Sequence, residues 1–142
     1  MTQEKPESAS ASLDKKDFEA LSQFRYELRK FLHFSEQAAQ EEGVTPQQYL
    51  LLLHIKGSPD REWASVGELA ERLQLQHHSV VALISRCESL KLVIRRRSET
   101  DKRQVNIHLL PAGERCLAKL AALHRAELKK LSDTFNIPHI NH

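Results

Sequence analysis

The residues with the most evident chemistry are the cations between positions 86 and 103. This stretch contains seven Lys or Arg residues and three Asp or Glu residues, a local charge of +4, whereas the whole chain carries only +2. The cations are Arg86, Lys91, Arg95, Arg96, Arg97, Lys102 and Arg103. A basic segment in an otherwise slightly acidic chain favours attraction to phosphate groups, such as those of a nucleic-acid backbone.

Two short helices are predicted next to this segment. Ser65 and Glu68 have the S-x-x-E spacing of a capping box, in which each side chain accepts a backbone N–H at a helix start. Apolar residues then recur at helical spacing, with Val66, Leu69, Ala70 and Leu73 in the first helix and Val80, Leu83, Ile84, Cys87 and Leu90 in the second. Residues 74–76 leave room only for a turn. Such a pair is typical of a helix-turn-helix, whose second helix can enter a DNA major groove.

A hairpin is predicted after the second helix. Val105, Ile107 and Leu109 alternate with polar residues, which is the period of a half-buried strand. Residues 92–97 are its expected partner, with residues 98–102 as the loop. Strand alternation places Arg96 on the face opposite Arg95 and Arg97, so the three cannot all contact one groove. An alternative is that these charges only protect a strand edge from aggregation.

Four segments resemble the winged helix-turn-helix of the MarR family of bacterial transcriptional regulators. They are ELAERL at 68–73, SRCESLKLVIRR at 85–96, DKR at 101–103 and LLPAG at 109–113. The resemblance extends from about residue 18 to residue 131. It implies a mainly α fold: a winged helix-turn-helix with a small β-hairpin wing and long N- and C-terminal dimerisation helices.

The resemblance also implies two groups of DNA-binding residues. The recognition helix would contribute Gln76, His77, His78, Ser79, Val81, Ala82 and Arg86. The wing would contribute Arg95, Arg96, Arg97, Lys102 and Arg103, with Asp101 orienting Arg103. The alternative for Asp101 and Arg103 is a plain hairpin ion pair, worth about 0–1 kcal/mol if exposed.

The chain departs from the family pattern at several positions. Gln76 stands where the family usually has Ser or Thr, and Leu110 stands where it usually has Thr before P-A-G. Lys91 replaces a Gly after the recognition helix, so it must accept the backbone twist that Gly accommodates. Basic residues common early in the recognition helix are absent. These differences leave the preferred base sequence undefined.

The remaining elements are predicted to form one domain, residues 14–142, after a disordered tail at 1–13. Long helices are expected at 14–42, capped by Asp14 and ended by Gly43, and at 111–135. A helix apolar nearly all round, starting with a capping box of Thr45 and Gln48, should lie at the centre. The reader, residues 66–110, lies between the long helices.

The long helices carry apolar stripes longer than a small domain needs. The predicted buried stripes are Phe18, Leu21, Phe24, Leu28, Phe31, Leu32 and Ser35 in the first helix, and Leu117, Leu120, Ala121, His124, Leu128, Leu131 and Phe135 in the last. Large apolar patches usually mark interfaces. We therefore expect a two-fold homodimer, as the resemblance also implies.

Other chemistry finds little support. No nucleophile elbow, phosphate loop or paired-carboxylate motif is present, so we expect no enzyme activity and no cofactor. His77 and His78 point about 100° apart on a helix and cannot easily chelate one metal ion, so no metal site is predicted. Cys87 should be buried on the inward face of its helix, with Cys116 the less buried thiol.

The sequence also bears on small-molecule binding and on cellular location. Phe24, Phe31, Tyr49 and Trp63 are candidates to line a pocket between the dimerisation helices and the reader, although mostly they should be core. No apolar run approaches the length of a membrane span, and two cysteines without a pairing pattern fit the cytoplasm.

The sequence therefore predicts a regulator that binds an inverted-repeat operator in duplex DNA and represses transcription by occupying a promoter. The resemblance alone implies that a small-molecule effector would weaken its DNA binding. The alternatives are a helical protein-interaction module that kept the fold but lost DNA binding, and a metal- or redox-sensing regulator.

Overall fold

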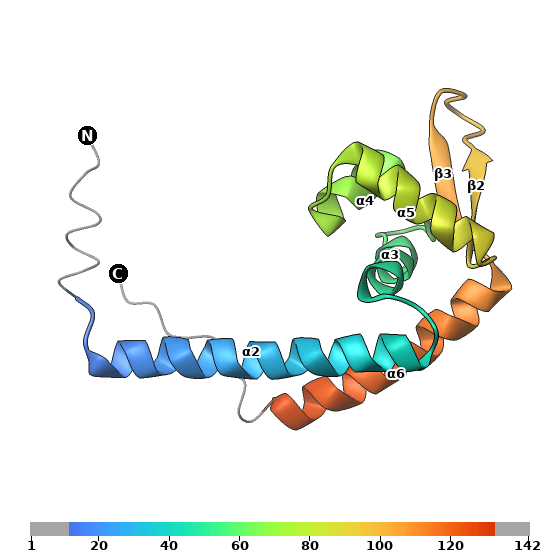
Figure 1. The fold of residues 1–142 in the computed structure, drawn as a ribbon. Coiled ribbons are helices and arrows are strands. Elements are labelled where there is room, and N and C mark those ends of the chain that lie inside the picture. Colours follow the sequence, from blue (N-terminus) through green and yellow to red (C-terminus); the bar gives the residue numbers. More distant parts are fainter. Residues whose placement is uncertain (1–11, 133–142) are drawn as a thin grey trace, which may run out of the picture. The chain divides into compact units, whose positions relative to one another are not determined.

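The computed structural model describes residues 12–132, which form five helices and three strands (Figure 1). In chain order these are α2 (Lys15–Glu41), α3 (Pro46–Lys56), β1 (Trp63–Ser65), α4 (Val66–Leu73), α5 (His77–Ser89), β2 (Val93–Arg97), β3 (Val105–Leu109) and α6 (Pro111–Leu131). Within the described residues, no helix combines the length and the apolar character needed to cross a membrane. The predicted mainly helical winged helix-turn-helix is confirmed.

The chain divides into two compact units. Of the described residues, 35–125 form the larger unit, and 12–34 with 126–132 form the other. Helices α2 and α6 each contribute to both units. The predicted tail, residues 1–13, lies almost entirely outside the described residues, as does Phe135 at the end of the predicted last stripe.

Both ends of α2 follow from local hydrogen bonds. Asp14 and Asp17 cap the start reciprocally, each carboxylate accepting the other residue's backbone N–H at 2.9–3.1 Å. At the other end Gly43 adopts φ +81°, and the Gly43 and Val44 N–H groups donate back to carbonyls of the last turn at 3.0 Å. This left-handed ending is the Schellman motif, which favours glycine. The predicted limits of this helix are confirmed.

Helix α3 lies at the centre of the larger unit. The predicted capping box is present, with the Thr45 N–H donating to Gln48 Oε1 at 3.0 Å and the Gln48 N–H donating to Thr45 Oγ1 at 3.1 Å. Leu51, Leu52 and Ile55 are fully buried, and α3 contacts α4, α5, β1 and β3. The apolar sequence of this helix is thus explained by burial on most of its sides.

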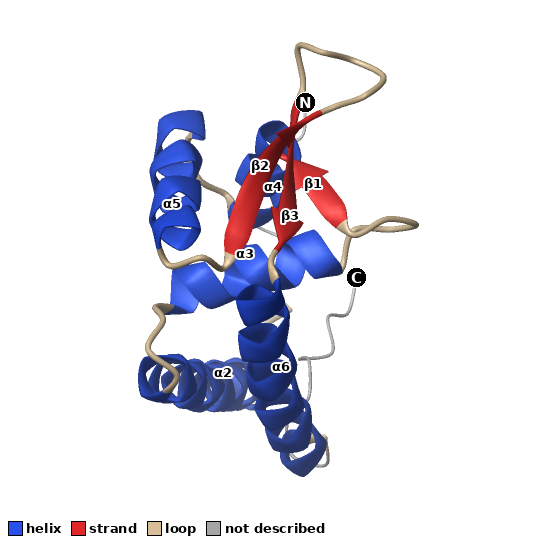
Figure 2. Cartoon of the chain, turned by 90° about the vertical axis from the view of Figure 1, so that its right-hand side faces the viewer, coloured by secondary structure: helices blue, strands red, loops and turns tan. Residues whose placement is uncertain are grey.

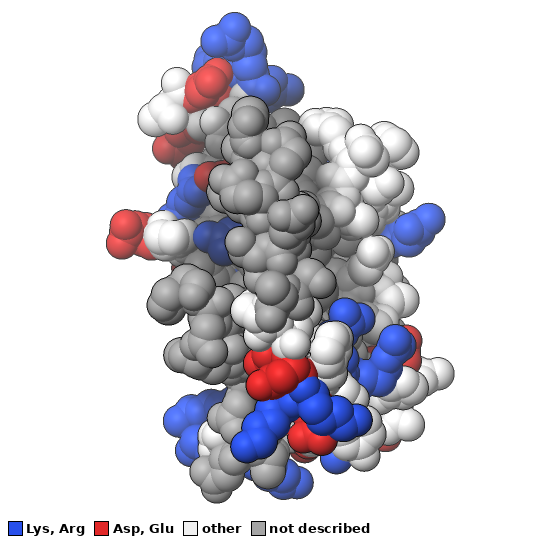
Figure 3. Space-filling model, turned by 90° about the vertical axis from the view of Figure 1, so that its left-hand side faces the viewer, with Lys and Arg blue, Asp and Glu red and all other residues white. Residues whose placement is uncertain are grey.

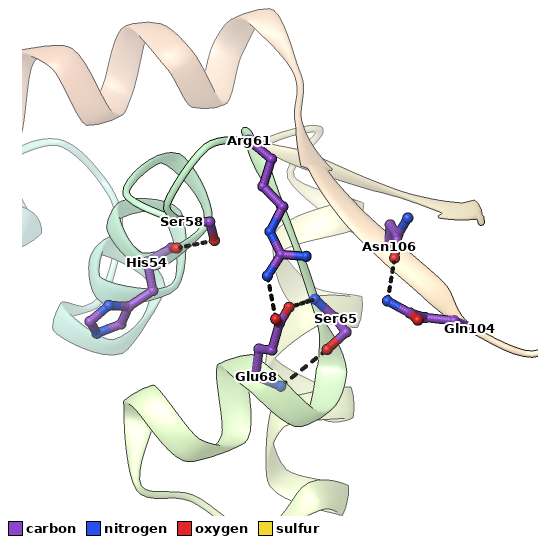
Figure 4. A network of polar contacts seen from close by, with 7 residues as sticks. All are labelled: His54, Ser58, Arg61, Ser65, Glu68, Gln104 and Asn106. Atoms are coloured by element: carbon purple, nitrogen blue, oxygen red, sulfur yellow. Dashed lines mark hydrogen bonds and ion pairs between the residues drawn. The ribbon is translucent and has the colours of Figure 1, made fainter. Parts of the chain in front are cut away.

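Helices α4 and α5 form the predicted helix-turn-helix. The Ser65–Glu68 capping box is present at 2.9 and 3.2 Å, and Arg61 adds an ion pair to the same Glu68 carboxylate (Figure 4). Inward residues Val80, Leu83, Ile84 and Cys87 of α5 are buried as predicted. Leu90 is a correction, because it lies beyond the last helical residue and its side chain is 50% exposed.

The turn after α5 uses a non-glycine residue in the left-handed region. Lys91 has φ +63°, and its N–H donates to the Glu88 carbonyl while the Leu92 N–H donates to the Cys87 carbonyl, both at 2.9 Å. This is a second Schellman ending. Lys91 therefore adopts the left-handed backbone conformation that was predicted for it, because it stands where the MarR pattern has Gly. A non-glycine residue in this conformation carries some backbone strain.

The three strands form one antiparallel sheet in the order β1-β3-β2 (Figure 2). Arg95 is opposite Ile107 in the β2–β3 register, and Ala64 is opposite Ile107 in the β1–β3 register. Ala64, Val93 and Ile107 are buried, which identifies the face of the sheet that packs on the helices. The hairpin was predicted, and β1 adds a third strand on its β3 side.

Gly113 explains the start of α6. A Cβ atom at this position would lie 2.1 Å from the backbone oxygen of Leu92, a distance that no side chain tolerates. The Leu110 N–H donates to that same Leu92 oxygen at 2.9 Å, so the backbones of the turn after α5 and of the α6 start are in contact. The glycine of the LLPAG segment is required by this close approach.

The long apolar stripes are only partly buried within one chain. Leu117, Leu120, His124 and Leu131 of α6 are buried, whereas Leu128 is 48% exposed. In α2, Phe18, Leu21 and Leu32 are between 44% and 55% exposed. The prediction that Phe18, Leu21, Leu32 and Leu128 are buried is wrong for the single chain. Their side chains leave apolar area exposed to solvent.

Candidate nucleic-acid interface

Most of the outward face of α5 is exposed. Of the predicted recognition residues, Ser79 and Val81 are half-buried, and the others are exposed: Gln76, His77, His78, Ala82 and Arg86. The Gln76 side chain makes no cap hydrogen bond at the start of this helix. The N–H groups of an uncapped first turn, at the positive end of the helix dipole, suit contact with a phosphate.

The wing comprises β2, β3 and the loop of residues 98–104, and its loop is ordered by its own hydrogen bonds. The buried Ser98 hydroxyl oxygen accepts the N–H groups of Thr100 and Asp101 at 3.3 and 3.1 Å. Arg97 Nη1 donates to the Lys102 carbonyl at 2.7 Å. The loop therefore presents its exposed cations from a defined backbone.

Arg103 is an almost fully accessible cation of the wing, with a side chain 94% exposed. Asp101 Oδ1 accepts the Arg103 N–H at 3.1 Å and lies 3.7 Å from Arg103 Nε. The predicted pairing of these two residues is thus present, and Lys102 beside them is exposed as well. In Figure 3, Lys or Arg side chains lie at the upper end of the view, where Figure 1 places this loop.

The three arginines of β2 have different surroundings. Arg95 lies against α5, where it pairs with Glu88 and donates to two further residues. Arg97 is tied to the loop carbonyl described above. Arg96 projects from the other sheet face toward His108, whose pKa is lowered by burial and by the Arg96 charge. Strand alternation separated these residues correctly, but it did not predict the contact of Arg95 with α5.

Burial raises the pKa of both thiols, Cys87 and Cys116. Cys87 is fully buried, and burial raises the pKa of its thiol to about 11. Cys116 is half-buried, and burial followed by the Glu42 charge raises its pKa too. Among residues 12–132, no three His, Cys, Asp or Glu side chains converge as metal ligands would. A high thiol pKa disfavours the thiolate that reacts with oxidants or metals.

The four aromatic residues predicted to line a ligand pocket are divided between the two compact units. Tyr49 stacks on His124 with ring centroids 4.6 Å apart, and Trp63 carries the Arg61 guanidinium 4.1 Å from its ring centre. Phe24 and Phe31 belong to the smaller unit. The structure does not confirm these candidates as one site.

A cavity of about 380 Å³ lies elsewhere, between the end of α3, the following loop and α4. The Arg61–Glu68 pair borders it on one side and His54 on the other (Figure 4). Burial, followed by the Arg72 charge, lowers the His54 pKa. Sequence reasoning missed this cavity, because its lining comes from three elements whose packing no local pattern reveals.

An exposed second helix, a preceding helix joined by a tight turn, and a basic β-hairpin together define a winged helix-turn-helix protein. Residues 42–104 match the sequence model of the MarR family. A Thauera aromatica protein named as the transcriptional regulatory protein for the hcr operon is 30% identical over 96 residues, 68% of this chain and 56% of that protein. The chain belongs to the MarR family, and this match spans little more than half of the relative's length.

Solved structures of MarR-family regulators share the fold. The regulator AbsC of Streptomyces coelicolor superposes with a TM-score of 0.73 at 23% identity, covering 89% of this chain and 84% of AbsC. A variant of S. aureus MepR bound to an oligodeoxyribonucleotide superposes with a TM-score of 0.65 at 19% identity, covering 80% and 81% of the two chains. At such identities the likeness establishes the architecture.

Proposed function

We propose that this protein binds duplex DNA and regulates transcription, with α5 in a major groove and the wing on the neighbouring backbone or minor groove. The observation that carries the proposal is the combination of an exposed first turn of α5, at His77 and His78, with an ordered wing loop whose Arg103 side chain is 94% exposed. Support also comes from MepR, which carries the same fold and is bound to an oligodeoxyribonucleotide.

The protein acts as a homodimer in this proposal. Phe18, Leu21, Leu32 and Leu128 expose 44–55% of their area in the single chain, on the helices predicted to dimerise. A second copy would remove these side chains from water, at about 25 cal/mol per Å² of apolar area. The dimer would present two α5 helices related by a two-fold axis.

Repression by steric occupancy of a promoter and release by a small molecule complete the proposal. The cavity beside Arg61 and His54 offers a volume of about 380 Å³ within the unit that carries α5. A ligand affects DNA binding only if it binds the DNA-competent and DNA-incompetent states with different affinity. Measurement of DNA affinity with and without the ligand tests this coupling.

Selection of bound sequences from a pool of random duplexes tests the proposed function. Two recognition helices reach successive major grooves about 34–36 Å apart, so the selected site should be an inverted repeat with half-site centres about 10–10.5 base pairs apart or a multiple. A direct repeat, or a single half-site bound with full affinity, contradicts the dimer geometry.

A helical protein-interaction module is the second candidate, because the early part of α5 lacks basic residues. This candidate would be favoured if the selection experiment enriched no sequence and if binding to duplex DNA were weak and insensitive to salt. Phosphate contacts make true DNA binding strongly salt-dependent.

A further inference from the structure

We propose that Arg95 is a positioning residue that fixes the wing against α5, rather than a residue that contacts DNA phosphates. The inference rests on the proposed DNA-binding function, and it concerns which residues make that binding specific. Its basis is the set of contacts that Arg95 makes across the boundary between β2 and α5, both of which lie within the unit of residues 35–125.

Arg95 contacts α5 through its backbone and through its side chain. Its guanidinium Nη1 forms an ion pair with the Glu88 carboxylate. The Arg95 backbone N–H points to the other Glu88 oxygen at 3.3 Å. Nη2 donates to Ser85 Oγ at 2.9 Å and to the Val81 carbonyl at 3.3 Å. The planar guanidinium fork is suited to such divergent contacts, which a lysine could not reproduce.

The three acceptor residues form one stripe along α5. Val81, Ser85 and Glu88 are separated by four and three residues, so they lie on the same helix face over about 10 Å of helix length. A single side chain that bonds two successive turns restricts both sliding and rotation of β2 relative to the helix. Because Arg95 pairs with Ile107 of β3, the restriction extends to the rest of the hairpin.

The charges also argue against a phosphate contact. Glu88 neutralises the Arg95 guanidinium, and the two side chains are 31% and 36% exposed. The pair as a unit therefore offers little attraction to a phosphate. Arg103 differs, because its side chain is 94% exposed and its carboxylate neighbour is 3.7 Å away. An ion pair as exposed as Arg95–Glu88 adds little to folding stability, so its consequence is mainly geometric.

The geometry matters because α5 and the wing must contact DNA at the same time. Base edges are read only if the recognition helix enters its groove at one depth and angle while the wing rests on the neighbouring backbone. A wing that moves relative to α5 would still attract phosphates through Arg103. It would lose the register that favours the operator over other sequences.

The experiment compares full-length Arg95→Ala and Glu88→Ala with wild type. Affinity is measured across a salt series for the selected operator and for a scrambled duplex. If Arg95 is a positioning residue, both variants should lower the ratio of operator affinity to scrambled-duplex affinity by a factor on the order of ten. This factor is the size of one lost base contact. The Arg95→Ala salt slope should stay at the wild-type value. The double variant Glu88→Arg with Arg95→Glu reverses both charges and restores an ion pair, so its affinity ratio should lie between those of the single variants and of wild type.

A phosphate contact at Arg95 predicts the opposite pattern. Arg95→Ala would then reduce the salt slope by about 1.8 for a dimer that loses two contacts. Glu88→Ala would tighten binding to both duplexes and leave their affinity ratio unchanged, because it removes a negative charge and frees the arginine. That pair of results would overturn the inference. Arg125→Ala is the control for these affinities, since it removes an exposed cation from α6, outside α5 and the wing.

A second measurement needs no DNA and separates this inference from the proposed function. Amide hydrogen exchange in the free protein should become faster in the wing of Arg95→Ala and of Glu88→Ala, and remain as in wild type in Arg96→Ala. Amides of α3 should be unaffected in all three. If the hydrogen-exchange rates of the wing amides are unchanged in both Arg95→Ala and Glu88→Ala, the positioning role is overturned, whether or not wild type binds DNA. Absence of any duplex binding by wild type would instead reject the proposed function.

Discussion

At the scale of single residues, Arg103 is the side chain whose loss should be easiest to interpret. Its 94% exposure leaves it available to a phosphate or a minor groove. Arg103→Ala should weaken the operator and a scrambled duplex by similar factors, because such contacts carry little base information. The salt slope should fall by about 0.9 per lost contact, hence about 1.8 for a dimer. Fluorescence anisotropy over a salt series measures both quantities.

The matched control for Arg103→Ala is Arg125→Ala, which removes an exposed cation from α6, outside α5 and the wing. It should leave affinity and slope close to wild type. An unchanged slope in Arg103→Ala would mean that the wing is structural in this protein, and the interaction-module alternative would gain support.

His77 should act through base contacts instead. It is exposed in the first turn of α5, which usually enters the major groove in helix-turn-helix proteins. His77→Ala should change the preferred base at one position of each half-site, at about 1–3 kcal/mol where a good contact is lost. Repeating the sequence selection with the variant checks this result. Identical selected sites for variant and wild type would exclude His77 from base recognition.

Local residue patterns were predictable, and contacts between elements were not. The reciprocal caps at Ser65 and Glu68 span three residues, so spacing alone predicted them, and the family resemblance implied the contact of Asp101 with Arg103. Arg95 was predicted only as a cation of a strand. Its contact with Val81, fourteen residues away, depends on how β2 packs on α5. The DNA-binding roles of all these residues stay predictions.

At the scale of elements, the backbone contact between Gly113 and Leu92 should be sensitive to one added methyl group. Gly113→Ala would place a Cβ 2.1 Å from the Leu92 oxygen, so α6 or the turn after α5 must shift. Overpacking of this kind costs about 1–3 kcal/mol. Urea denaturation followed by circular dichroism measures the change in the free energy of unfolding.

Gly67→Ala provides the matched control for that measurement. A Cβ at Gly67 would meet no atom within 4 Å, and the residue lies inside α4. Alanine is favoured over glycine in a helix by up to about 1 kcal/mol, so this variant should be as stable as wild type or slightly more stable. Equal destabilisation of both variants would contradict the role assigned to Gly113.

Element types followed from periodicity, whereas element burial did not. Caps and helical spacing predicted the five described helices, and alternation predicted the hairpin. The same spacing also predicted that Phe18 and Leu32 are buried, yet they are 55% and 53% exposed. A stripe shows that one helix face is apolar, but the sequence does not tell whether that face packs within the chain or on another molecule.

At the scale of the whole molecule, the exposed apolar residues of α2 and α6 should drive dimerisation. Phe18→Asp and Leu128→Asp introduce charge at side chains that are 55% and 48% exposed, so the single chain should still fold. Both variants should sediment as monomers at concentrations where wild type is a dimer. Leu90→Asp is the control, because Leu90 is 50% exposed on the unit of residues 35–125. A folded wild-type monomer at micromolar concentration would rule out the dimer.

The most direct test of the central claim is the affinity of wild-type protein for its selected duplex and for a scrambled duplex over a salt series. DNA binding through α5 and the wing predicts tighter binding to the selected duplex, by a factor of about 10³ or more at physiological salt. It also predicts that log affinity falls linearly with log salt concentration, at about 0.9 per phosphate contact. Equal affinities for the two duplexes, or binding that does not change with salt, would contradict the claim.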